Sequence, residues 1–247
     1  MLRVGCDLDG TVADMDGALQ QHAEALFGPG VDVRFSVGAQ RELPSDGDEP
    51  AESAHHSTQA TTGLAAGAAD EDKRRPLTSR EYSYLWSHVG KIENFWETLG
   101  ETEPGGVARF SELSRTRGWE VLFVTQRPPS AGDLAQRQSM RWLAANGYDL
   151  PSAIVLKGNR GTLANTLHLD AFIDDRSENC IDIASESKTL PLLLWRGPRA
   201  LAPPGASRMK IHTVFSFAEA LDCLEALSDA RSKPPSLMSR LKNVIRP

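Results

Sequence analysis

The sequence predicts an α/β fold, in which a doubly wound parallel sheet carries a small helical cap inserted after its first strand. Short apolar runs recur along the chain, and they lack the strict alternation of a half-exposed strand. A stretch with helix signals follows most of these runs. Strands that helices cover on both faces have this composition, and regular alternation of strand and helix is typical of a parallel sheet.

Five apolar runs are the strand candidates, and each leads into a polar or charged residue. They are Leu2–Cys6, Trp119–Val124, Ala153–Leu156, Ala171–Ile173 and Leu192–Trp195. A chain of 247 residues is long enough for such a sheet together with an insertion.

Three further stretches carry the start and stop signals of helices. We expect helices over 106–117 after a Pro-Gly turn, over 131–146 between Ser130 and Gly147, and over 217–228 behind the capping-box pattern of Ser216 and Glu219. With the strands, they assign residues 1–13 and 100–228 to the catalytic core.

The segment 14–99 interrupts this rhythm and is expected to form the helical cap. Within it, Ser36–Pro76 is rich in small and acidic residues and has almost no large apolar ones, so we predict a disordered stretch there. Thr78 and Glu81 then form a capping box before a helix with an apolar face. A second short apolar stretch holds Phe95 and Trp96.

The tail 229–247 is basic and follows the core. Its apolar residues between Leu237 and Ile245 have helical spacing, which predicts a short amphipathic helix. Two interpretations remain open: the helix packs on its own domain, or it contacts a partner or a membrane surface.

Charge and cysteine content exclude several classes of protein. The net charge of −6 gives no basic footprint for a nucleic acid polymer. The 3 cysteines lie far apart, without the spacing of a zinc site or a disulfide framework. No apolar signal-peptide region opens the chain, and no apolar run approaches the roughly 18–20 residues of a membrane span. We therefore expect a cytoplasmic protein.

Reactive polar residues follow four of the predicted strands. They are Asp7 with Asp9, then Thr125, then Lys157, then Asp174 with Asp175. Because ligands bind beyond the carboxyl ends of the strands in open α/β sheets, these side chains are expected to share one site.

This combination suits phosphoryl transfer. Asp7 can attack phosphorus and form an acyl phosphate, and Asp9 can protonate the leaving oxygen and later activate water. Thr11 can hold the intervening turn by hydrogen bonding. Thr125 supplies a hydroxyl, and Lys157 a positive charge, to the phosphoryl oxygens.

Several carboxylates that converge in one site repel one another unless a cation lies between them. Mg²⁺ prefers oxygen ligands, which Asp7 and Asp174, with the carbonyl of Asp9, can supply. Asp175 is either a further ligand or a residue behind the ligands. Arginines follow three of these positions, at Arg127, Arg160 and Arg176, and they either contact phosphate or face solvent.

The run Asp7-Leu8-Asp9-Gly10-Thr11 resembles motif I of the haloacid-dehalogenase-like (HAD) superfamily. Thr125, Lys157 and Asp174-Asp175 resemble its motifs II, III and IV, in the expected order. The resemblance implies a Rossmann-like core, Mg²⁺ and a phospho-aspartate intermediate. The second aspartate of motif I favours phosphatases over the dehalogenase branch.

A narrower resemblance is to the 5′(3′)-deoxyribonucleotidases. It rests on residues 7–17, on 94–99 followed by Glu103-Pro104-Gly105, and on 173–176. On this resemblance a nucleobase stacks on Phe95 and Trp96, and the alternative is that the two aromatic side chains pack in the core. We also expect Thr11, Gln126 and Arg127 to contact the substrate. Gln126-Arg127-Pro128 departs from that family's more usual Ser-Pro after the threonine, and the 36–76 stretch has no counterpart there.

The function predicted from the sequence is therefore a Mg²⁺-dependent phosphomonoesterase that acts on a small phosphorylated substrate, with a 5′-nucleotidase as the narrower form. A phosphotransferase or phosphomutase with the same aspartate chemistry and a non-catalytic module that binds phosphorylated ligands remain alternatives. The oligomeric state is left open.

Overall fold

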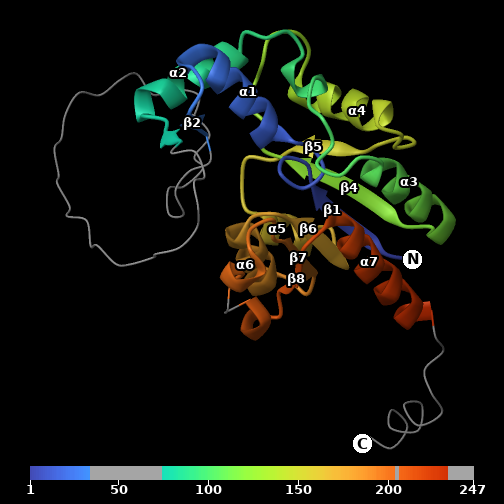
Figure 1. Cartoon of the computed structure of the whole chain (residues 1–247). Coiled ribbons are helices and arrows are strands. Elements are labelled where there is room, and N and C mark those ends of the chain that lie inside the picture. The colour runs from blue at the N-terminus through green and yellow to red at the C-terminus, as the bar shows by residue number, and fades with distance from the viewer. Residues whose placement is uncertain (34–73, 204–205, 233–247) are drawn as a thin grey trace, which may run out of the picture.

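The computed structural model describes residues 1–33, 74–203 and 206–232, and a six-stranded parallel sheet forms its centre (Figure 1). In spatial order the strands are β5 (Ala153–Val155), β4 (Glu120–Thr125), β1 (Arg3–Asp7), β6 (Ala171–Asp174), β7 (Leu190–Leu194) and β8 (His212–Val214). All neighbouring strands run parallel. This order confirms the doubly wound sheet, since the chain leaves the central β1 toward both edges. The short strand β8 was not expected from the sequence.

Helices cover both faces of the sheet. The helices are α3 (Gly106–Arg117), α4 (Ala135–Ala145), α5 (Arg160–Thr166), α6 (Ser177–Glu186) and α7 (Phe217–Ser232), with short 3-10 turns η2 (Arg199–Leu201) and η3 (Ala206–Met209). Phe123 and Ile173 pack in one buried cluster with side chains of α3, α4 and α7. Their neighbours Val124 and Phe172 pack on α5 and α6, on the other side. Figure 1 shows α5 and α6 together, opposite α3 and α7. Since alternate strand residues point to opposite faces of the sheet, the central strands are buried on both faces.

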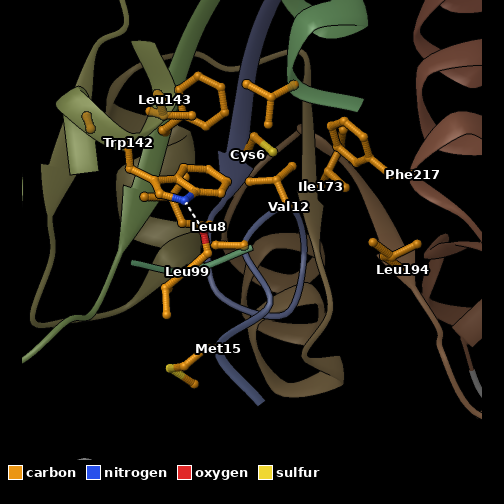
Figure 2. Packing of buried hydrophobic residues seen from close by; sticks show 14 of the residues in the cluster. Cys6, Leu8, Val12, Met15, Leu99, Trp142, Leu143, Ile173, Leu194 and Phe217 are labelled. Atoms are coloured by element: carbon orange, nitrogen blue, oxygen red, sulfur yellow. Dashed lines mark hydrogen bonds between the residues drawn. The ribbon is translucent and has the colours of Figure 1, made fainter. Parts of the chain in front are cut away.

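The larger cluster connects the sheet to the chain that leaves the insertion. The indole Nε1 of Trp142 in α4 donates a hydrogen bond of 2.7 Å to the carbonyl of Leu99, as Figure 2 shows. Phe110 contacts Phe123 and Phe217 edge to face. Each large side chain buried in this way contributes about 1.5–3 kcal/mol to stability. The packing fixes the point where the insertion returns to the core.

Between β1 and α3 lie α1 (Met15–Phe27), β2 (Val31–Asp32), β3 (Arg75–Pro76), α2 (Ser79–Val89) and the 3-10 turn η1 (Phe95–Glu97). The predicted capping box of α2 is confirmed: Glu81 N donates to the Thr78 hydroxyl, and Thr78 N donates to the Glu81 carboxylate. β2 and β3 pair in parallel. The division of the chain into core, cap and tail stays a prediction.

Two predicted segments fall wholly or largely outside the described residues. Of the stretch 36–76 expected to be disordered, only 74–76 are described, and Arg75–Pro76 form β3. The amphipathic helix expected over 237–245 lies outside the described part of the chain. No helix in the described part is both long and apolar enough to span a membrane.

Two helix boundaries differ from the prediction. α4 begins at Ala135 rather than at residue 131, because Gly132 adopts a φ of +91° and breaks the helical path. The side chain of Asn94 accepts a hydrogen bond from Asp133 N and holds this turn. α7 continues to Ser232, beyond the expected end near Ser228 and into the predicted tail. An ion pair between Arg117 and Asp229 holds this extra turn on α3.

Candidate active site

The loop that follows β1 requires glycine at position 10. Gly10 has a φ of +85°, and its N–H donates to the carbonyl of Ala13 at 2.9 Å to close a tight turn. A Cβ atom at Gly10 would lie 2.2 Å from a carboxylate oxygen of Asp175. The glycine therefore permits both the turn and the close approach of the loop after β6.

Arg196, which follows β7, holds the same loop from outside. Its Nε donates to the carbonyl of Gly10 and its Nη2 to that of Thr11, both at 2.9 Å. Its Nη1 lies 3.2 Å from a carboxylate oxygen of Glu103. No role was predicted for Arg196, since a basic residue after a strand carries no sequence signal of such a contact. The Thr11 side chain is fully buried, and its hydroxyl has no hydrogen-bond partner among the described residues.

Asp7 and Asp174 lie buried at the carboxyl ends of adjacent strands, with Arg160 beside both. Arg160 Nη2 donates to Asp7 Oδ1 at 3.0 Å, and Arg160 Nε lies 3.9 Å from Asp174 Oδ2. Burial, together with the charge of Asp9, raises the pKa of Asp7 to about 6 despite Arg160. Burial and then the charge of Asp7 raise the pKa of Asp174 well above its usual value. One guanidinium therefore compensates the two carboxylates only in part.

Asp174 is oriented by the first turn of α6. Its carboxylate accepts hydrogen bonds from Arg176 N at 2.9 Å and from the Asn179 side chain at 3.0 Å. Asn179 also lines the pocket described below, and the sequence analysis did not identify it. Asp175, the neighbouring residue, packs against Gly10 instead.

Asp9 has two partners of its own. The Thr125 hydroxyl donates to Asp9 Oδ2 at 2.7 Å, and Arg127 donates to both carboxylate oxygens through Nε and Nη2. The side chain of Arg127 is fully buried, and that of Asp9 is 12% exposed. Thr125, expected to hold a phosphoryl oxygen, thus contacts the candidate acid/base residue in this structure.

A pocket connects these groups with the insertion. Its polar lining comes from the strand ends, from α5 and α6 and from Asp16 of α1, and its apolar lining comes mainly from α1, α2 and η1. The lining residues are Asp7, Asp9, Met15, Asp16, Leu19, Val33, Tyr82, Trp86, Trp96, Gln126, Arg127, Pro128, Arg160, Arg176 and Asn179. The cavity volume is about 60 Å³. Typical sites for larger ligands have roughly 300–1,000 Å³, so a bulky substrate requires the helices of the insertion to move outward.

Six predicted site residues lie outside the lining of this pocket. They are Thr11, Phe95, Thr125, Lys157, Asp174 and Asp175. Lys157 is exposed to solvent, and Arg160 contacts Asp7. Phe95 is fully buried against His22 and Trp96. Thr11 is fully buried within the loop after β1. The roles assigned to Lys157, Phe95 and Thr11 stay predictions.

The acidic side chains at the strand ends are the candidate ligands of the expected metal site. In residues 1–33, 74–203 and 206–232, no group of three or more His, Cys, Asp or Glu side chains is arranged to hold a metal ion. Arg127 binds the Asp9 carboxylate, which leaves Asp7 and Asp174 as the pair facing each other. Mg²⁺ in proteins is often held by one or two carboxylates and retains several waters. Asp7 and Asp174 are buried carboxylates with raised pKa values and one guanidinium beside both, and this arrangement fits such an ion.

Comparisons with known proteins add a weak structural likeness. No family model and no curated protein matches the chain. A putative beta-phosphoglucomutase from Thermotoga maritima has a TM-score of 0.49 and 12% identity, covering 92% of this chain and 99% of that chain. A HAD hydrolase of family IA, variant 3, from Entamoeba histolytica HM-1:IMSS has a TM-score of 0.42 and 10% identity, covering 89% and 95%. At these values neither match carries an inference about the activity of this chain.

Proposed function

We propose that this chain is a phosphomonoesterase of the HAD type, with Asp7 as its nucleophile. The observation that supports it best is the pair formed by Asp7 and Arg160 at the floor of the pocket. Arg160 is buried, and its Nε and Nη1 have no hydrogen-bond acceptor among the described residues. A buried guanidinium N–H without a hydrogen-bond acceptor lowers the stability of the fold, and a phosphoryl group bound next to Asp7 would supply the missing acceptors.

In the proposed reaction, a carboxylate oxygen of Asp7 attacks phosphorus while the bond from phosphorus to the leaving oxygen breaks. Asp9 donates a proton to that oxygen, and the alcohol leaves. Asp9 then accepts a proton from water, whose oxygen attacks the phosphorus of the acyl phosphate. The bond between phosphorus and Asp7 breaks, which restores both side chains and releases inorganic phosphate.

Asp7 and Asp174, with the main-chain carbonyl of Asp9, are the groups that would hold Mg²⁺. When bound, the ion supplies positive charge that offsets the two carboxylates and polarises the phosphoryl oxygens. Arg160 would stabilise the same oxygens through its donors that lack an acceptor. The similar role expected for Lys157 stays a prediction.

The narrower proposal is a 5′-nucleotidase. Tyr82, Trp86 and Trp96 line the pocket beside Asp7 and Asp9. These aromatic rings favour a leaving group that itself has a planar ring. A nucleoside exceeds the cavity of about 60 Å³, so this proposal requires α2 to move outward. A phosphotransferase would share the first step and would differ only in the acceptor that replaces water.

The test is a phosphate-release screen over nucleotides, sugar phosphates and phospho-amino acids, with and without Mg²⁺. We expect release by the wild-type protein, and none by Asp7→Asn, because an amide is not a nucleophile. Asp222→Asn, an exposed residue of α7, is the matched control and should keep full activity. Release that survives in Asp7→Asn would contradict the mechanism. Consumption of substrate without free phosphate, in the presence of an added alcohol, would favour the transferase.

A further inference from the structure

Arg127 is held by three different groups of the protein: the Asp9 carboxylate, the Ser139 hydroxyl and the Trp96 ring. Its Nε lies 3.0 Å and 3.1 Å from the two carboxylate oxygens of Asp9, and its Nη2 lies 2.8 Å from Oδ1. This is a forked, charge-assisted contact, which fixes the plane of a carboxylate as well as its position.

The remaining sides of the guanidinium are also held. Nη1 donates to the Ser139 hydroxyl of α4 at 2.9 Å, and the guanidinium carbon lies 4.9 Å from the centre of the Trp96 ring. A cation placed over an indole ring is attracted by its π electrons. Arg127 therefore cannot turn toward a bound phosphate without losing contacts on several sides.

Trp96 is itself fixed in the core. Its indole Nε1 donates to the carbonyl of Pro128, and its main-chain N donates to the side chain of Gln138 in α4. Trp96 belongs to η1 and contacts Arg127, which in turn binds the Asp9 carboxylate. The orientation of Asp9 therefore depends on the position of η1.

We propose that Arg127 is a positioning residue: it acts through Asp9, by holding the Asp9 carboxylate in the orientation needed for proton transfer, and Trp96 supports it. This proposal rests on the proposed function, because it assumes that Asp9 transfers protons. It replaces direct substrate contact as the main role of Arg127. Its consequence is that removing the fork lowers turnover without weakening substrate binding.

A double-mutant cycle distinguishes the two roles. Arg127→Lys is the first variant, because it keeps the buried charge and removes only the planar fork. Arg127→Gln is the second, and it removes the charge as well. Each is combined with Asp9→Asn, and kcat and KM are measured for an alkyl phosphate that the wild-type protein hydrolyses. Thermal unfolding of every variant checks the fold.

We expect Arg127→Lys to lower kcat at least tenfold, as part of the roughly 10²–10⁴-fold that a positioned acid/base residue contributes. KM should change less than about twofold, and in the Asp9→Asn background the further loss of kcat should vanish, because the two residues act as a unit. Arg115→Lys is the matched control: this exposed arginine pairs with Glu112 within α3, outside the pocket, and its substitution should leave both constants unchanged.

Two outcomes would overturn the positioning role while leaving the proposed function intact. One is an equal loss of kcat with and without Asp9. The other is a raised KM with unchanged kcat, which would mean that Arg127 binds the substrate directly. Absence of phosphate release from the wild-type protein is a different failure, and it would remove the proposed function together with this proposal.

Discussion

Replacing the buried Asp7 carboxylate with an amide should stabilise the fold at neutral pH, although it abolishes turnover. Burial raises the pKa of Asp7 from its usual 3.8 to about 6 in the folded protein. The difference of about two pH units corresponds to about 3 kcal/mol at 1.36 kcal/mol per unit. A folded-state pKa above the unfolded one means that the folded state binds the proton more tightly. The stabilisation from that proton is complete below pH 3.8 and is lost as the pH rises through about 6.

The assay is urea unfolding of the wild-type protein and of Asp7→Asn between pH 4 and pH 8, at roughly half-unit intervals and with a chelator present. The two proteins should have similar free energies of unfolding near pH 4, and Asp7→Asn should become more stable by up to about 3 kcal/mol near pH 8. Asp222→Asn, on the exposed surface, should differ from the wild type by less than about 0.5 kcal/mol throughout. If Asp7→Asn is the less stable protein at pH 8, then Arg160 more than offsets the cost of burial, and the reasoning is refuted.

Three further predictions concern the loop, the metal and the insertion. Gly10→Ala should lower the free energy of unfolding more than Gly28→Ala does. The two glycines have similar φ angles of +85° and +87°, but only at position 10 does the added methyl group meet Asp175. Equal losses in chemical unfolding would show that this contact is unimportant. Mg²⁺ at about ten times its dissociation constant should stabilise the wild-type protein by about 1.4 kcal/mol in a thermal unfolding assay, and Asp174→Asn should lose this effect; an unchanged shift would place the ion elsewhere. Tyr82→Ala should raise KM for a nucleotide roughly tenfold and leave a small aryl phosphate unaffected, because stacking contributes about 1–3 kcal/mol per base; Tyr84→Ala, on the exposed side of α2, is the control, and equal effects on both substrates would mean that Tyr82 only packs.

The sequence predicted the fold and the floor of the site because both depend on local patterns. A strand that is buried on both faces is a continuous run of apolar residues, so the first polar residue after the run marks its carboxyl end in the sequence. Asp7, Thr125 and Asp174 are the last residues of β1, β4 and β6, which are neighbours in the sheet. Parallel strands bring their carboxyl ends to one edge, and this geometry needs no knowledge of the loops.

The contact of Arg160 with Asp7 could not be predicted in the same way. Lys157 and Arg160 both follow β5, and the burial of Arg160 depends on where α5 begins. Asn159 caps the helix by accepting a hydrogen bond from Thr162 N at 3.0 Å, so Arg160 is its first residue. Gly161 then allows close packing on α6, since a Cβ there would lie 2.3 Å from the carbonyl of Asp182. Asn159, three residues before Thr162, was the sequence signal for the helix cap. The close packing of Gly161 on α6 has no signal in the sequence.

The distribution of charge explains why a cation is expected between two of the carboxylates and not at the third. Asp9 has its own buried guanidinium, Arg127, which contacts both of its oxygens. Asp7 and Asp174 share Arg160, which makes one hydrogen bond to the first and lies 3.9 Å from the second. Uncompensated charge in a buried site is relieved by a proton or by a bound cation, and the raised pKa values of Asp7 and Asp174 record this deficit. The same deficit would disfavour an anionic phosphoryl group at Asp7, so binding of substrate and binding of the metal ion should favour each other. The Asp9–Arg127 pair belongs to the same balance, because the charge of Asp9 raises the pKa of Asp7 and the charge of Arg127 lowers it. Proton transfer at Asp9 and the charge on Asp7 are therefore linked.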